Sequence, residues 1–407
     1  MKIIKAAKQE IQQYLSPVEE VALANQEKVL KAFHAARVGS HCFTDSTGYA
    51  YSDQGRETLE EVYARVFRAE AALVRPQIVS GTHAISICLS ILEPGEELVS
   101  ASGAPYDTLQ AVIGVRGDSP RSLVKRGIIY KEVPLQADLT LDLAGITAAV
   151  SEKTKMVMLQ RSRGYSWRPA LRISAIAEAV KAIRKKNSNC IIFVDNCYGE
   201  FVEYFEPLEV GVDLIAGSLI KNPGGTLATS GGYIAGREDL VDLCGEILTA
   251  PSLGNKLGAM FGLTREILHG LFLAPHVVGE ALSGAILAAQ IFTELGFTVS
   301  PQAQDPRSDI VQAIRFRSQE ELLRFCHGIQ KAAPIDAHYM PVPSLMPGYV
   351  HEVVMAGGTF IQGSSIELSA DAPLREPYIG YLQGGMSRQH VEIGLSYALQ
   401  EMGLDVD

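Results

Sequence analysis

The sequence has 407 residues, of which 47% are hydrophobic and 20% charged, and its formal net charge at pH 7 is −10. This composition is typical of a globular protein large enough for two or three domains. The chain lacks the basic excess that usually accompanies nucleic-acid binding or adhesion to an anionic membrane. We therefore expect a small-molecule ligand.

The cysteines and the apolar segments indicate where in the cell the protein is found. The six cysteines are scattered and form no Cys-x-x-Cys pair, which indicates reduced thiols in a cytoplasmic protein. No continuous apolar stretch follows the two early lysines, and no segment approaches the roughly 18 apolar residues of a membrane span. A cytoplasmic location is expected.

Three parts are predicted along the chain. A helical arm over residues 1–45, interrupted at Pro17, is indicated by apolar residues spaced by three or four. Over residues 46–270, predicted helices alternate with apolar strands such as KMVMLQ, CIIFVD, DLIAGSLI and SGGYIAG, which is typical of a mainly parallel α/β sheet covered on both faces. Residues 271–407 continue a Gly- and Ala-rich helical stretch and add the strand candidates DIVQAIRF, HEVVMAGG and SSIELSA and a last helix, which favours a smaller α+β domain.

Two charged residues end neighbouring apolar segments. CIIFV ends in Asp195, and DLIAGSLI ends in Lys221, followed by the turn NPGG. Ligands gather at the carboxyl ends of strands in open α/β sheets, and a pyridinium nitrogen needs an anionic partner to stay protonated. Taken alone, Asp195 is equally consistent with an aspartate that holds a metal or caps a helix, and Lys221 alone is better explained as an ordinary solvated lysine. Together, with the pattern Ser-x-x-Lys-x-x-Gly-Gly, they favour a cofactor site.

The loops before two predicted helices contain further residues that could bind a cofactor: a possible phosphate site and an aromatic residue. Ser80, Gly81 and Thr82 open a helix whose free backbone N–H groups and dipole suit a phosphate, although Ser80 is equally consistent with a simple N-cap. Ser218, three residues before the lysine, could add a hydrogen bond to the phosphate. Tyr106, in the next strand-to-helix loop, could stack on a cofactor ring or simply pack.

Motifs for other cofactors are missing from the sequence. It contains no GxGxxG for a dinucleotide and no GxxxxGK[ST] for a nucleoside triphosphate. The nine histidines are dispersed without HExxH or another ligand spacing, so no metal site is expected.

In this order, these residues resemble fold-type I pyridoxal-phosphate enzymes, most closely the group of cystathionine lyases and methionine gamma-lyase. The segments VDNCYGEF, SLIKNPGG, TGYAYSDQGRETLEEVYARVF and LREPYIGYLQGG are similar to the branch named aluminium resistance proteins, and the likeness runs from about residue 30 to 400. That name records a phenotype and defines no reaction. The resemblance implies the fold of pyridoxal-phosphate-dependent transferases.

The resemblance also implies roles at the cofactor. Lys221 would hold pyridoxal 5'-phosphate as a Schiff base, Asp195 would pair with the ring nitrogen, and Tyr106 would stack on the ring. The phosphate would be held by the residues at the helix start and strand end, Gly81, Thr82 and Ser218.

The same resemblance implies how chains would pair and which residue would bind the substrate carboxylate. Such enzymes pair two chains so that a Tyr and an Arg of the neighbour reach the phosphate, and Tyr51 and Arg56 are the candidates. A homodimer is expected as the active unit, with pairing into a homotetramer. Arg375 is the candidate for the substrate carboxylate, which suits bidentate guanidinium, although an exposed loop arginine is nearly as consistent.

The sequence departs from the lyase pattern at three places. Ile220 stands where typical cystathionine lyases have a threonine before the lysine, and VDNC places Cys197 near the cofactor. The segment LQRSRGYSWRP brings Arg161 and Arg163 where an asparagine would touch the ring hydroxyl. These changes leave the substrate more open than the cofactor.

The expected reaction is β- or γ-elimination from a sulfur-containing amino acid of the cystathionine or methionine type, giving a 2-oxo acid and ammonia. Freed Lys221 would remove the alpha proton, with its pKa lowered by burial near other cations. The alternatives are another fold-type I reaction, such as transamination or a condensation, or a sensor that binds the cofactor or an amino acid without turnover.

Overall fold

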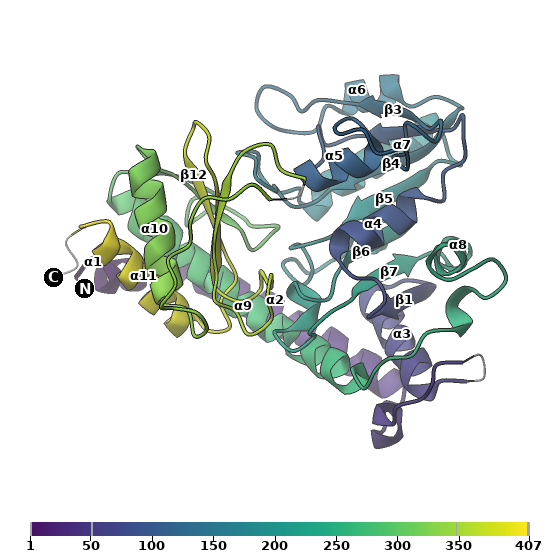
Figure 1. Cartoon of the computed structure of the whole chain (residues 1–407), viewed down its shortest axis with the longest axis horizontal. Helices are drawn as coiled ribbons and strands as arrows, with labels where there is room; N and C mark the ends of the chain where they lie inside the picture. Colours follow the sequence, from purple (N-terminus) through teal and green to yellow (C-terminus); the bar gives the residue numbers. More distant parts are fainter. Residues whose placement is uncertain (1, 50–51, 347, 405–407) are drawn as a thin grey trace.

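The computed structural model describes residues 2–49, 52–346 and 348–404 (Figure 1). Its large sheet has seven strands in the order β1-β7-β6-β5-β4-β2-β3. Strand β7 runs antiparallel to β1 and β6, and the other neighbours are parallel. The predicted, mainly parallel sheet is confirmed, with these bounds: β1 Ala71–Arg75, β2 Glu97–Ser100, β3 Ile129–Glu132, β4 Thr154–Gln160, β5 Ile191–Asp195, β6 Leu214–Ser218 and β7 Gly232–Gly236.

Helices cover both faces of this sheet because its strands are apolar on both sides. In β5, Ile192 and Val194 belong to one apolar cluster, and Ile191 and Phe193 to the cluster on the opposite face, as the alternation of side chains along a strand requires. The helices that accompany the sheet are α3 Gln54–Phe67, α4 Gly81–Leu89, α5 Asp107–Ile113, α6 Leu143–Ala149, α7 Ile173–Lys186 and α8 Glu238–Leu248.

The N-terminal arm is helical, but its break is not at Pro17. Helix α1 spans Lys2–Glu10 and α2 spans Gln12–Ala35, so Pro17 lies inside α2, and the helices separate at Ile11. A short 3₁₀ turn, η1, follows at Ser40–Phe43. A proline removes one helical hydrogen bond, whereas α2 packs along the long helix α9 and buries apolar residues on both sides of the proline. The packing outweighs the lost bond.

The second sheet is antiparallel and lies C-terminal to the long helix α9, Thr264–Glu294. Its order is β10-β11-β12-β9-β8. The expected strand SSIELSA is displaced, since β11 begins only at Ser369. The bounds are β8 Thr298–Ser300, β9 Gln312–Arg315, α10 Gln319–Lys331, β10 Val353–Ala356, β11 Ser369–Pro373, β12 Ile379–Gln383 and α11 Arg388–Glu401. Helix α9 runs unbroken through residue 270, so the domain boundary expected there stays a prediction.

No segment as long and apolar as a membrane span is expected from the sequence, but helix α9 is one. By length and composition it is apolar enough to cross a membrane, but 72% of its most apolar window is buried inside the protein. It contacts α2 and α11, and Figure 1 shows it running from the part of the chain around the large sheet into the part around the small sheet. These are the surroundings of a core helix.

Helix α9 also fixes the loop that follows β6. This loop contains Lys221 and the 3₁₀ turn η3, Asn222–Gly224. A Cβ added at Gly270 of α9 would lie 2.1 Å from the carbonyl oxygen of Gly224, and one added at Gly225 would lie 2.1 Å from that of Gly270. Backbone therefore packs directly on backbone, which holds the lysine loop in place.

Gly270→Ala should destabilise the protein, because a methyl group there meets a carbonyl oxygen that cannot move aside freely. We expect the free energy of unfolding to fall by about 2 kcal/mol in urea denaturation. Gly279→Ala in the same helix is the matched control, since its Cβ would lie 3.3 Å from the Ala22 Cβ and helix propensity offsets the tight contact. Equal stability of the two variants would contradict the packing described here.

Candidate active site

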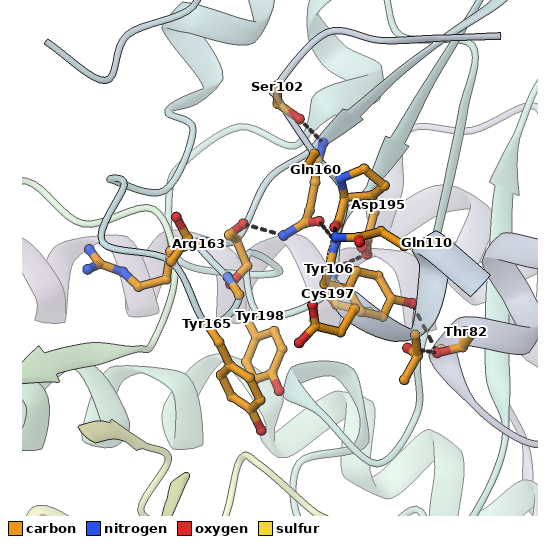
Figure 2. Close-up of a pocket in the computed structure, with 18 of the residues that line it drawn as sticks. Thr82, Ser102, Tyr106, Gln110, Gln160, Arg163, Tyr165, Asp195, Cys197 and Tyr198 are labelled. Carbon is orange, nitrogen blue, oxygen red and sulfur yellow. Dashed lines mark hydrogen bonds between the residues drawn. The ribbon is translucent and has the colours of Figure 1, made fainter. Parts of the chain in front are cut away.

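A cavity of about 720 Å³ lies at the carboxyl ends of β4, β5 and β6 (Figure 2). Register explains part of this placement, since Gln160 at the end of β4 is paired with Asp195 at the end of β5. The structure brings together eight of the ten residues that the sequence analysis gave a cofactor or substrate role, which all line this cavity: Ser80, Gly81, Thr82, Tyr106, Asp195, Ser218, Lys221 and Arg375.

Asp195 supplies a buried carboxyl group at the floor of the cavity. Its Oδ1 accepts a hydrogen bond of 3.2 Å from the backbone N–H of Cys197, and only 4% of the residue is exposed. Burial raises the pKa of Asp195, although the Cys197 N–H and the positive charges of Lys221 and Arg168 oppose the rise. A cation bound beside it would stabilise the ionised form.

Lys221 enters the same cavity from the loop after β6. Its Nζ lies 3.6 Å from the centre of the Tyr198 ring and donates to Ser365 Oγ at 3.4 Å. Burial opposes the charge, but the phenol of Tyr198, the thiol of Cys197 and the carboxylate of Asp195 outweigh it and raise the pKa of Lys221. The expectation of a lowered pKa is wrong for this arrangement, because the groups facing the amine are not cations.

The N-terminus of α4 forms one end of the cavity. Ser80 is its N-cap, and Ser80 Oγ accepts from the His83 N–H at 3.1 Å. The N–H groups of Gly81 and Thr82 have no acceptor within the helix. A Cβ at Gly81 would lie 3.2 Å from Cys197 Sγ, which is closer than an ordinary contact. Bare backbone donors at a helix N-terminus suit a phosphate group.

Tyr106 is fixed from two sides. Its backbone N–H donates to Gln160 Oε1 at 2.9 Å, and its hydroxyl lies 3.0 Å from Thr82 Oγ1. Figure 2 shows its ring beside Asp195 and Cys197, with the hydroxyl turned toward Thr82. A flat ligand between Asp195 and the α4 end would therefore meet an aromatic face.

The two residues expected to reach a neighbour's phosphate differ in what the structure says of them. Tyr51 is outside the described residues, and Arg56 does not line the cavity. Arg56 is 2% exposed, and its guanidinium donates within its own chain to the carbonyl oxygens of Gly48 at 3.2 Å, Gly258 at 3.1 Å and Lys256 at 3.1 Å. Its contacts join two loops of one chain, and its reach to a neighbour's phosphate stays a prediction.

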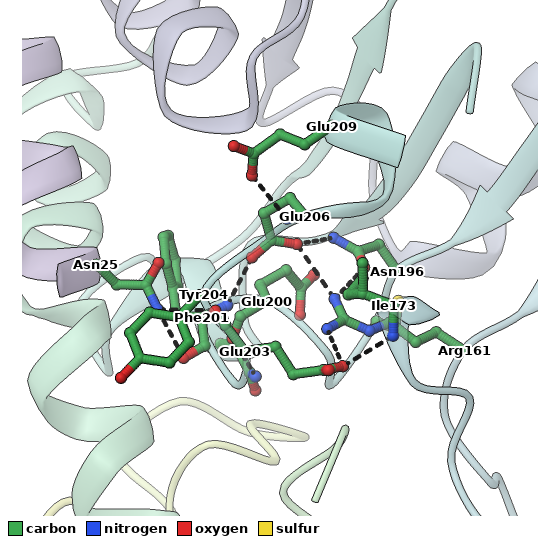
Figure 3. Close-up of polar contacts among 12 residues, drawn as sticks. Asn25, Arg161, Ile173, Asn196, Glu200, Phe201, Glu203, Tyr204, Glu206 and Glu209 are labelled. Atoms are coloured by element: carbon green, nitrogen blue, oxygen red, sulfur yellow. Dashed lines mark hydrogen bonds and ion pairs between the residues drawn. The ribbon is translucent and has the colours of Figure 1, made fainter. Parts of the chain in front are cut away.

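The two arginines of LQRSRGYSWRP separate in space. Arg161 does not enter the cavity, contrary to expectation, because its guanidinium is held on the other side by two carboxylates and an amide. Its Nη1 donates to Asn196 Oδ1 at 2.8 Å and to Glu206 at 3.1 Å, and its Nη2 to Glu203 at 3.2 Å (Figure 3). Arg163 does line the cavity.

Three tyrosines of the cavity wall were not singled out from the sequence. Tyr198 follows Cys197 with a left-handed φ of 69°, and Tyr165 lies 5.6 Å from Tyr349 between ring centres. All three line the cavity. Tyr165 and Tyr198 stand within quoted motifs, but a loop tyrosine shows no periodic signal that would reveal its direction.

Glu200 lies in the same polar layer as Arg161. Its Oε1 accepts from the Tyr233 hydroxyl at 2.8 Å, and its Oε2 is buried with no hydrogen-bond partner among the described residues. Burial raises the pKa of Glu200 to about 8. The carboxyl is therefore mainly protonated at neutral pH.

A lysine, a strand-end carboxyl and a helix N-terminus around one cavity fit pyridoxal phosphate, and the fold is that of the fold-type I pyridoxal-phosphate enzymes. At 18% identity, the structure of the pyridoxal-5'-phosphate-dependent protein YhfS from Escherichia coli shares this fold with a TM-score of 0.64, over 94% of this chain and 97% of that one. The sequence matches the family described as methionine gamma-lyase over residues 1–403, and the chain belongs to that family.

More similar relatives cover almost the whole chain. The uncharacterized protein YnbB of Bacillus subtilis (strain 168) is 48% identical over 387 residues, 95% of this chain and 92% of that protein. The carbon-sulfur lyase involved in aluminum resistance from Clostridium novyi NT is 46% identical, with a TM-score of 0.94 over 98% of this chain and 94% of that one. A candidate cystathionine beta-lyase involved in aluminum resistance from Listeria monocytogenes is 49% identical. Its TM-score is 0.96, and the match covers 98% of this chain and 99% of that one.

Glu200→Gln should flatten the dependence of stability on pH. Between the ordinary pKa of 4.5 and about 8, the folded state holds the Glu200 proton and the unfolded state has lost it. The free energy of unfolding therefore falls as the pH rises through this window, by at most roughly 1.4 kcal/mol per pH unit from this group. Urea denaturation at several pH values measures the slope.

The amide keeps an acceptor for Tyr233 and does not titrate, so the slope contributed by Glu200 should disappear. Glu178→Gln, on an exposed position of α7, should leave the slope unchanged. A Glu200→Gln profile parallel to that of the unmodified protein would show that Glu200 is ionised at neutral pH.

Proposed function

We propose that this protein is a pyridoxal-phosphate-dependent carbon–sulfur lyase that acts on an amino acid of the cystathionine or methionine type. The observation that carries the proposal is the enclosure of Lys221 and Asp195 in one cavity with the N-terminus of α4. Membership of the methionine gamma-lyase family supports it, and so does the carbon-sulfur lyase named among the similar structures.

The cofactor would occupy the cavity in one orientation. Lys221 would bind it covalently, Asp195 would face the ring nitrogen, and Tyr106 would lie on the ring. The phosphate would be held by the α4 end and β6, with Ser80, Gly81, Thr82 and Ser218. Bound in this way, the cofactor supplies an electron sink for the negative charge that develops at the substrate's alpha carbon.

Lys221 is the group that moves the proton. It reaches into the cavity beside Tyr198, and the groups around it raise its pKa. A raised pKa keeps the free amine protonated at neutral pH, so Lys221 would act as base only from the neutral form in which its covalent attachment to the cofactor would leave it. The buried carboxylate of Asp195 would pair with the nitrogen at the opposite end of the ring and favour its protonated form.

The surroundings of the lysine fit an elimination. Ile220, where typical cystathionine lyases have threonine, lines the cavity and gives it a hydrocarbon surface. Tyr165, Tyr198 and Tyr349 line the cavity as well. A thioether side chain packs favourably against aromatic rings, which suits a substrate whose sulfur leaves from the beta or gamma carbon.

The assembly and location complete the proposal. The active unit would be a homodimer, pairing into a homotetramer, in which Tyr51 and Arg56 of each chain approach the neighbour's phosphate. The enzyme would work in the cytoplasm. Aluminium tolerance, which the names of similar structures mention, is a phenotype that an amino-acid lyase could affect indirectly.

Product analysis with Lys221→Ala tests the function. The unmodified enzyme, given pyridoxal phosphate and L-cystathionine or L-methionine, should release ammonia, a 2-oxo acid and a thiol in equal amounts. Lys221→Ala should lower the rate by at least roughly 1,000-fold, because the base is lost, and leave the urea midpoint close to that of the parent. Lys181→Ala, at an exposed position of α7, is the control with full activity.

The products separate the proposal from its rivals. Transfer of the amino group to an added 2-oxo acid without release of ammonia would indicate a transaminase. A bound cofactor whose spectrum no amino acid changes would indicate a protein without turnover. Full activity of Lys221→Ala would contradict the assignment of the base.

A further inference from the structure

The amine of Lys221 has few polar partners in the cavity. Its Nζ donates to Ser365 Oγ at a long 3.4 Å, and among the described residues it forms no ion pair with a carboxylate. Asp195 raises the pKa of Lys221 through its charge, without a hydrogen bond. The group that lies directly against the amine is the Tyr198 ring, whose centre is 3.6 Å from Nζ. The aromatic face therefore takes the place that a carboxylate usually takes beside a buried ammonium.

The backbone of Tyr198 is held in a conformation that few residues with a side chain adopt. Its φ of 69° is left-handed, which is costly for a residue with a Cβ. The Gly199 N–H closes the turn by donating to the Asn196 carbonyl oxygen at 3.0 Å. Arg161 holds the same turn from outside the cavity by donating to Asn196 Oδ1 at 2.8 Å. The surrounding structure thus maintains a strained turn that carries a cavity-lining ring.

The ring of Tyr198 is also part of a packed wall. Together with Tyr165 and Trp167, Tyr198 packs against a small buried cluster near β9 and β12. Figure 2 shows Tyr198 beside Tyr165. The cluster consists of Val311, Ala313, Ile379 and Tyr381. Because this wall comes from the C-terminal part of the chain and does not depend on the lysine, the ring is a fixed surface for the amine.

We propose that the ring face of Tyr198 binds the free ammonium of Lys221 and stabilises the proton that the amine takes from the substrate, which rests on the function proposed above. The π-electrons of a ring face attract a cation, most strongly where water is excluded. A substrate that displaces Lys221 releases its neutral amine beside this ring. The amine takes the alpha proton, the electron pair of the broken C–H bond stays with the substrate and its electron sink, and the ammonium that forms lies on the ring.

A fluorinated series at position 198 tests the contact. Tyr198→Phe keeps the ring face, whereas trifluorophenylalanine at this position keeps nearly the same size but has fewer π-electrons to attract a cation. The full-length protein, freed of cofactor, is treated with acetic anhydride at about pH 9, below the pKa of an ordinary lysine amine. Acetylation of Lys221 is followed by peptide mass spectrometry.

The acetylation rate reports how strongly the ammonium is held, because only the neutral amine reacts. Lys221 should react about fivefold faster in the trifluorinated variant than in Tyr198→Phe, since a weaker contact lowers the pKa of the amine by about one unit. Tyr198→Phe should lie within about twofold of the unmodified protein, because the ring face is kept. Lys181, exposed on α7, is the internal control and should react equally in all of them.

The holoenzyme tests the consequence for proton transfer. Exchange of the alpha proton of L-methionine in heavy water, followed by NMR, should be about fivefold slower in the trifluorinated variant than in Tyr198→Phe. The apparent Kd for L-methionine should change by less than about twofold, since the contact is with the lysine. A monofluorinated ring should give intermediate values and carries the test if the trifluorinated protein does not fold.

Equal acetylation of Lys221 in Tyr198→Phe and the folded fluorinated variants would overturn the inference. An increase already complete in Tyr198→Phe would also overturn it and assign the contact to the hydroxyl. Exchange that does not respond to fluorine would contradict the role in proton transfer. These results leave the proposed function standing. An unmodified holoenzyme that exchanges no alpha proton of L-methionine or L-cystathionine would contradict the proposed function, whereas the acetylation series tests the contact separately.

Discussion

The structure depends on two opposite charges held in one enclosed cavity, the carboxylate of Asp195 and the ammonium of Lys221. Either charge buried alone would be costly, and both are placed by backbone that cannot shift easily. Asp195 ends a strand buried along its whole length, and the lysine loop rests against the backbone of α9 at Gly270. The sheet and the long helix thus act together to position the two groups that the proposed chemistry requires.

A second polar layer supports the same strand ends from outside the cavity. Arg161 is fully buried and bonded to Glu206, which is also fully buried, and Asn196 bridges the two. Two nearby arginines after β4 therefore join different parts of the fold. Arg161 holds the sheet to the segment after β5, whereas the buried guanidinium of Arg163 reaches Ser300 in the C-terminal part of the chain.

Much of this could be predicted from the sequence because it is local. The apolar runs that end in Asp195 and in Lys221 mark strands, and the glycines after Lys221 mark a close approach of backbone. The sheet, its strand ends and the lysine loop could therefore be predicted. The path of a helix and the direction of a side chain could not be predicted where contacts with residues distant in the sequence decide them. Pro17 stays inside a helix because α9 supports it, and Arg161 turns from the cavity because the carboxylates that hold it lie 42 and 45 positions away along the chain. The same limit applies to Tyr198, whose ring meets Lys221 only in the folded chain.

The most direct test of the central claim is where the cofactor attaches. The purified protein is incubated with pyridoxal phosphate, its visible absorption is recorded, and the complex is reduced with borohydride and mapped by mass spectrometry. The account predicts a yellow protein with one pyridoxyl adduct per chain, on Lys221. A colourless protein that takes up no pyridoxal phosphate, or an adduct on another lysine, would contradict the assignment of Lys221 and Asp195 as the working site.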